Sequence, residues 1–146
     1  MTLKVILDAN IFLSYLLAPA TERTITSIVR ACFTEEVDLI APPELLAEIV
    51  EKLQNKRYFR ERVRQELIAN FVQQMTVLTA FISPVEQIPT FSRDPDDDYL
   101  IAYGLMNDVD YLVTSDLDLL VLKQVEQLKI VRPKTFLDIL DELGLH

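Results

Sequence analysis

Two short apolar stretches that each lead to an aspartate constrain the fold of this chain more than any other feature. Residues 3–7 are almost wholly apolar and run directly into Asp8. Residues 109–114 repeat the pattern and are followed by Ser115 and Asp116. A nearly continuous apolar run is typical of a strand that is covered on both faces in a parallel sheet. Both aspartates are therefore predicted to lie at the carboxyl edge of such a sheet, where open α/β sheets bind their ligands.

Helical patterns separate the predicted strands. Pro43, Pro95 and Pro133 stand where helices are expected to begin, because proline suits the first helical turn. The alternation of strands and helices predicts an α/β fold with a mostly parallel sheet flanked by helices, in one domain spanning residues 1–146. The predicted strands are 3–7, 37–41, 109–114 and an edge strand at 130–131; the predicted helices are 11–17, 24–33, a pair within 43–78, one from 95, 117–122 and 133–143, with 79–90 as a short strand or loop.

Hydropathy and cysteine content limit the class of protein. No apolar run approaches the ~18 residues of a membrane-spanning helix, so we expect a soluble, cytoplasmic protein. The single cysteine, Cys32, lies in the apolar pattern of a helix. It excludes an internal disulfide and predicts a buried structural thiol rather than a nucleophile.

The charge of the chain is unevenly distributed. A net charge of −9 opposes binding to nucleic acid, because phosphate contacts need lysine and arginine. Yet six of the 14 basic residues fall within positions 52–64, where they interleave with Tyr58 and Phe59. That mixture suits a nucleic-acid backbone with unstacked bases, and it equally suits a solvated helical corner with both rings packed inward. The basic residues that we predict to contact nucleic acid under the first interpretation are Lys52, Lys56, Arg57 and Arg60.

The stretch 94–98 carries four acids around one proline. Asp94 is placed to cap a helix that begins at Pro95, but capping needs only one acid. Two carboxylates about 4 Å apart repel by roughly 4 kcal/mol at an effective dielectric constant near 20, so converging carboxylates usually indicate a cation. The alternative is an over-acidic, solvated helix start. Asp97 lies on the inward face, four residues before Ile101, and spacing alone does not choose between Asp97 and its neighbour Asp98.

A further acid, Glu48, lies on the border of the apolar stripe of the helix that begins at Pro43, whereas Glu44 and Glu51 are expected to be solvated. If these acids meet, their oxygen ligands suit Mg²⁺ or Mn²⁺ rather than zinc. Such ions support phosphodiester hydrolysis without another catalytic residue type. The predicted ligands are Asp8, Glu48, Asp97 or Asp98, and Asp116, with Asn10, Thr114 and Ser115 placed to orient water or a ligand.

These signatures occur in one order along nearly the whole chain. Leu-Asp8-Ala-Asn10, an acid on the helix after Pro43, Asp94-Pro-Asp-Asp-Asp98 and Val-Thr114-Ser-Asp116 together resemble the PIN-domain family, particularly its VapC-like branch of toxins from toxin–antitoxin systems. The resemblance implies a three-layer α/β/α nuclease fold and a Mg²⁺- or Mn²⁺-dependent site that cuts single-stranded RNA. It also implies a homodimer that a small antitoxin protein holds inactive.

The resemblance also assigns the acids. It places the family's first acid on Asp8, its helix-borne glutamate on Glu48 and its last aspartate on Asp116. For the third acid, counting back from Thr114 favours Asp98, whereas the inward helical pattern favours Asp97, which we rank first.

Two other functions fit parts of the sequence. A haloacid-dehalogenase-like phosphatase also uses a strand-tip aspartate, but its second aspartate would fall on Asn10, and no suitably placed lysine follows a later strand. A PIN-like module without catalytic activity would bind RNA or a protein through its surface. It would retain RNA affinity through residues 52–64 but would show no cleavage with added Mn²⁺.

Overall fold

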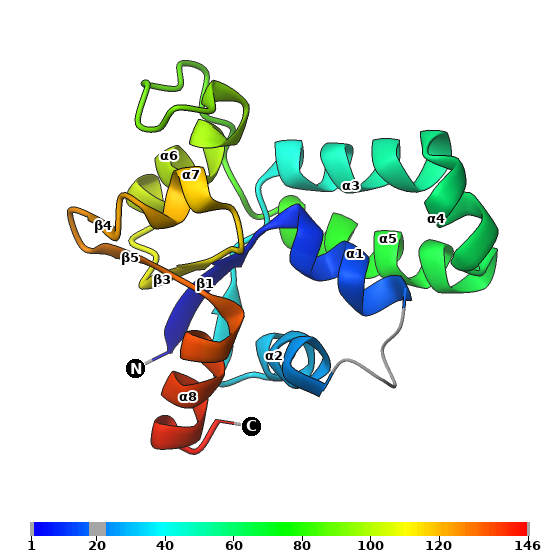
Figure 1. Cartoon of the computed structure of the whole chain (residues 1–146), viewed down its shortest axis with the longest axis horizontal. Helices are drawn as coiled ribbons and strands as arrows, with labels where there is room; N and C mark the ends of the chain where they lie inside the picture. Colours follow the sequence, from blue (N-terminus) through cyan, green and yellow to red (C-terminus); the bar gives the residue numbers. More distant parts are fainter. Residues whose placement is uncertain (1, 18–22, 146) are drawn as a thin grey trace.

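The computed structural model describes residues 2–17 and 23–145, and its centre is one five-stranded sheet (Figure 1). The strand order is β2-β1-β3-β5-β4. The first four strands in this order are parallel, and β4 runs antiparallel to β5. This confirms the predicted α/β fold with a mostly parallel sheet. The strands are β1 (Leu3–Leu7), β2 (Val37–Leu39), β3 (Tyr111–Val113), β4 (Gln124–Val125) and β5 (Leu128–Val131).

The register of the parallel strands brings three strand ends to one level. Leu7 pairs with Val113, and Val113 pairs with Val131. The alignment continues one residue further, because the Asp8 amide donates to the Val113 carbonyl at 3.0 Å and the Thr114 amide donates to the Val131 carbonyl at 3.0 Å. The residues that follow the three strands therefore stand in a row at the carboxyl edge of the sheet.

Helices cover both sides of the sheet. In Figure 1, α2 and α8 lie side by side below the sheet, α6 lies above it, and α1, α3 and α5 extend to the right. The three predicted proline starts are confirmed, at the first residues of α3, of the 3-10 turn η1 and of α8. The helices are α1 (Ala9–Leu17), α2 (Arg23–Cys32), α3 (Pro43–Asn55), α4 (Arg57–Arg62), α5 (Gln65–Thr79), η1 (Pro95–Asp97), α6 (Asp98–Met106), α7 (Leu117–Leu120) and α8 (Pro133–Leu143).

Two sequence predictions of secondary structure were wrong. The strand at 130–131 is not an edge strand, because β4 pairs outside it through a two-residue turn in which Glu126 adopts a φ of 51°. A non-glycine residue at positive φ gives no sequence signal for such a hairpin. The segment 43–78 holds three helices rather than a pair, because the basic corner itself folds as the short helix α4.

Two side chains of α6 hold the long segment that connects α5 to η1. The Tyr103 hydroxyl accepts a hydrogen bond from the Val85 amide at 2.9 Å. The Asp98 carboxylate, only 1% exposed, accepts from the Phe91 and Ser92 amides at 3.0 and 2.9 Å, and from the Ser92 hydroxyl at 2.7 Å. These bonds fix the segment immediately before the acidic stretch.

The predictions made from cysteine content and from hydropathy can also be compared with the structure. Cys32 is 2% exposed, and burial raises the pKa of its thiol to about 12, as expected of a structural cysteine. Among residues 2–17 and 23–145, no helix has the length and apolar character needed to cross a membrane.

Replacing Asp98 by Ala is expected to lower the free energy of unfolding by about 3 kcal/mol, because the Phe91 and Ser92 amides would lose their charged acceptor. Asp96→Ala is the matched control, since this carboxylate is exposed two residues away. Its effect should stay within about 0.5 kcal/mol. Urea unfolding of both variants measures the difference, and equal stabilities would refute a structural role for Asp98.

Candidate metal centre

A cavity of about 780 Å³ opens at the carboxyl edge of the sheet, where several chain elements contribute acids. Asp8 follows β1, and Asp116 follows β3 and caps α7 by accepting from the Asp118 amide at 3.0 Å. Glu48 projects from α3 into the same cavity. Asp94 and Asp97 come from the start of η1 and from its last residue. The exposed Asp96 of η1 also lines the cavity, and the other five carboxylates come to it from four separate parts of the chain.

Thr114 connects the two strand-tip aspartates. Its buried hydroxyl donates to Asp8 Oδ2 at 2.7 Å and accepts from the Asp116 amide at 3.0 Å. Asp8 is itself 5% exposed. Burial raises the pKa of Asp8, the Thr114 hydrogen bond lowers it, and the charge of Glu48 raises it again. Thr114 therefore orients Asp8 and partly offsets the cost of its burial.

The tightest group of acids comprises Asp94, Asp97 and Asp116. One carboxylate oxygen of each lies within 4.8 Å of those of the other two. Burial raises the pKa of Asp97 to about 8, with further contributions from its hydrogen bond to Asp116 and from the charges of Asp8, Asp94 and Asp116. This group strongly favours a proton or a cation over three bare charges.

Asp94 has a second role that was not predicted from the sequence. Its side chain caps η1 as predicted, accepting from the Asp96 amide at 3.1 Å. The same carboxylate also belongs to the group with Asp97 and Asp116. The excess of acids around Pro95 was the sequence signal for this second role. Asp94 was not counted among the predicted ligands because helix capping already explained its position.

Two tyrosine–glutamate pairs join α6 to α3. Tyr99 donates to Glu48 Oε1 at 3.0 Å, and Tyr103, one turn later, donates to Glu44 Oε1 at 2.8 Å. Burial, together with the charge of Glu48 and the hydrogen bond to it, raises the pKa of Tyr99, which therefore stays a donor. The prediction that Glu44 is solvated was wrong, because Tyr103 holds it. Neither tyrosine was identified from sequence, since the partner of each lies more than fifty positions away.

Lys52 neutralises the second oxygen of Glu48. Its ammonium group lies 3.0 Å from Glu48 Oε2, one helical turn along α3, and both side chains are partly exposed. Lys52 also lines the acidic cavity. A lysine thus stands at the site together with the carboxylates.

The other predicted site residues fall into two positions. Asn10 and Ser115 line the cavity and are exposed. Asp98 lies outside the cavity lining, and both of its carboxylate oxygens are occupied by the hydrogen bonds to the preceding segment. Of the two candidates for the third acid, the structure brings Asp97 to the other acids.

The predicted basic surface continues outward from Lys52. Lys56 follows the last residue of α3 and is exposed, as are Arg57 and Arg60 of α4. Arg57 pairs with Glu61 at 2.6 Å. Tyr58 is 54% exposed, so the interpretation with both aromatic rings packed inward was wrong for Tyr58, while Phe59 is half-buried against the core.

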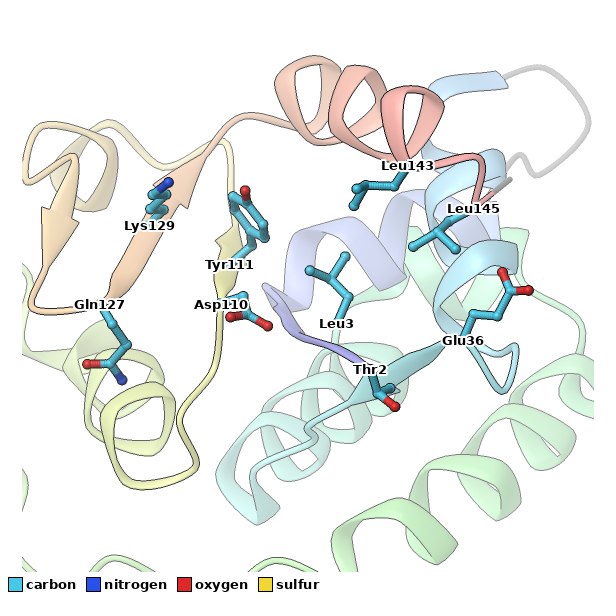
Figure 2. A pocket seen from close by; sticks show the side chains of 9 residues that line it. All are labelled: Thr2, Leu3, Glu36, Asp110, Tyr111, Gln127, Lys129, Leu143 and Leu145. Atoms are coloured by element: carbon cyan, nitrogen blue, oxygen red, sulfur yellow. The ribbon is translucent and has the colours of Figure 1, made fainter.

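A second cavity, of about 750 Å³, lies at the opposite edge of the sheet (Figure 2). It is lined by the first residues of strands, such as Leu3 and Tyr111, and by Leu143 near the C-terminus. Two acids line it, Glu36 and Asp110, and the Asp110 carboxylate accepts a hydrogen bond from the Lys4 amide at 2.9 Å. No group of acids like the one at the carboxyl edge occurs there among the described residues.

The raised pKa of Asp97 predicts a pH-dependent effect of Asp97→Asn on the metal-free protein. Between pH 4 and 8 the folded chain keeps a proton that the unfolded chain has released, since the ordinary pKa is 3.8. The free energy of unfolding contributed by Asp97 therefore falls as pH rises through this range. Asp97→Asn should match the parent near pH 4 and exceed its melting temperature near pH 8. The prediction would be contradicted if the melting temperatures of the parent and of Asp97→Asn changed equally with pH across this range.

Comparison with known proteins identifies the family. A family model described as "PIN domain" matches residues 4–118, which include all five converging acids. Searches of curated proteins and of solved structures found no match. Because the match covers most of the chain, this protein belongs to the PIN domain family, whose members are generally nucleases that depend on divalent metal ions.

Proposed function

We propose that this protein is an endoribonuclease that hydrolyses phosphodiester bonds of single-stranded RNA with Mg²⁺ or Mn²⁺. The observation that carries this proposal is the convergence of Asp94, Asp97 and Asp116 within 4.8 Å, beside the buried Asp8, in a PIN domain. The match to this family argues against the phosphatase alternative. The RNA substrate and the metal follow from the family resemblance and the chemistry of the oxygen ligands.

The residues present fit a hard divalent cation. Every converging group is a carboxylate, and the described part of the cavity lining includes neither histidine nor cysteine. Oxygen-only sets of this kind suit Mg²⁺ and Mn²⁺. A bound ion would supply Lewis acidity toward water and the scissile phosphate. The residues that would hold it are Asp94, Asp97 and Asp116, with the buried Asp8 beside them and Glu48 from α3 in the same cavity.

The chain's own polar groups prepare the site for this ion. Thr114 donates a hydrogen bond that orients the Asp8 carboxylate, and Tyr99 donates one that orients Glu48. Asp97 shares a hydrogen bond with Asp116, so a cation held by both carboxylates would replace the proton between them. The ammonium group of Lys52 is close enough to the cavity to turn from Glu48 toward a substrate phosphate, because i,i+4 ion pairs near the surface contribute only ~0.5 kcal/mol and this pair is partly exposed.

The biological role that we propose is that of the toxin in a toxin–antitoxin system. The support is the VapC-like resemblance of the four acidic signatures. A toxin of this kind would act in the cytoplasm, form a homodimer and be restrained by a cognate antitoxin protein.

Asp8→Asn is expected to abolish cleavage of single-stranded RNA, because the buried carboxylate is a proposed metal ligand. The fold should be as stable as the parent or slightly more stable, since the change removes one repelling charge while leaving an acceptor for Thr114. Cleavage of a labelled RNA with Mn²⁺ measures the loss. Asp110→Asn, at the opposite edge of the sheet, is the control and should cleave like the parent.

Metal binding itself is tested by thermal unfolding with and without Mn²⁺. At about 100 times its dissociation constant the ion should stabilise the parent by roughly 2.7 kcal/mol and raise the melting temperature by several degrees. The shift should be lost in Asp8→Asn and kept in Asp110→Asn. RNA binding without cleavage, in a parent that does bind Mn²⁺, would favour the alternative of an inactive RNA-binding module.

A further inference from the structure

The row of residues at the carboxyl edge of the sheet does not end with the acids. Because Leu7, Val113 and Val131 are in register, the next residues, Asp8, Thr114 and Arg132, follow at one level on three neighbouring strands. Adjacent strands lie about 4.8 Å apart, so the Arg132 backbone stands roughly 10 Å from that of Asp8. The basic Arg132 therefore follows β5 at the level where the carboxylate of Asp8 follows β1.

A third cavity lies between Arg132 and the acidic cavity. A cavity of about 420 Å³ is lined by Arg132 and Lys134 at the start of α8, and by Ser115. Ser115 also lines the acidic cavity. A polymer that occupies the acidic cavity can therefore continue across Ser115 toward Arg132.

The charges at this edge follow the order of the strands. Lys52, on the helix that follows β2, and Arg132, after β5, stand on opposite sides of the acids that follow β1 and β3. Among the described residues, Arg132 takes part in no ion pair. Lys134 pairs with Asp138 at 3.1 Å, but both side chains are largely exposed, so this pair is weak. The cation beyond the acids is thus available to another anion.

We propose that Arg132, assisted by Lys134, binds a backbone phosphate of the RNA strand on the side of the acidic site opposite to Lys52. This inference rests on the proposed function and adds the path of the substrate. A polyanion approaching five carboxylates is repelled unless cations flank them, and a chain of net charge −9 has few cations to place there. With one cation on each side, the site holds phosphates before and after the scissile bond, which favours cleavage within a strand over removal of terminal nucleotides.

The test compares Arg132→Gln with Arg30→Gln in the full-length protein. Both changes remove one exposed arginine charge, and Arg30 on α2 lines a different cavity, which shares no lining residue with the acidic cavity or with that of Arg132. The Arg132 side chain makes no capping hydrogen bond to α8, so its loss should leave the fold intact. The probe is a labelled single-stranded oligoribonucleotide, with binding measured over a range of salt concentrations in the Asp8→Asn background. Cleavage is measured with Mn²⁺ in the parent background.

Arg132→Gln should weaken RNA binding roughly fivefold, reduce the slope of log affinity against log salt by about 0.7, and raise KM with little change in kcat. Arg30→Gln should bind and cleave like the parent. Equal effects of the two variants, with a parent that binds and cleaves RNA, would overturn this inference and leave the proposed function standing. A parent that binds RNA without cleaving it would overturn the proposed function, while the binding comparison would still decide the role of Arg132. A parent that does not bind RNA would overturn both.

Discussion

Carboxylates converge at one edge of the sheet, and the residues around them must compensate their mutual repulsion. Parallel register delivers Asp8 and Asp116 to neighbouring strand ends, and η1 adds Asp94 and Asp97. Charges this close destabilise a folded chain unless protons, hydrogen bonds or cations compensate them. Burial, the hydrogen bond to Asp116 and the neighbouring charges all raise the pKa of Asp97, so this side chain favours its protonated form when no cation compensates the charges. Asp94, Asp97 and Asp116 thus form a group that could hold a metal ion.

Polar side chains from the surrounding elements hold this arrangement in place. Thr114 spans the two strand tips, and Tyr99 and Tyr103 join α6 to the glutamates of α3. Asp98 and Tyr103 also hold the segment that leads into η1. Because each of these contacts is buried or partly buried, the acids are positioned by the scaffold rather than by their own mobile side chains.

The order of strands also distributes positive charge around the acids. Lys52 lies on one side of the acidic cavity and Arg132 on the other, with Ser115 between the two cavities. An acidic protein can bind a polyanion if its few cations stand along the path of that polyanion. Whether such a surface can bind RNA therefore depends less on the net charge of the chain than on where its charged side chains lie.

Local sequence patterns were enough to predict the α/β alternation, the helix starts at proline and the strand-tip positions of Asp8 and Asp116, because these features depend on nearby apolar residues and backbone preferences. They left Asp97 and Asp98 undecided, since adjacent residues at a helix start differ only in what they meet in space. Tertiary structure directed Asp98 to the Phe91 and Ser92 amides and Asp97 to Asp116. It alone also added β4 beside β5 and set Arg132 level with Asp8, because strand order and register arise from contacts between residues far apart in the chain.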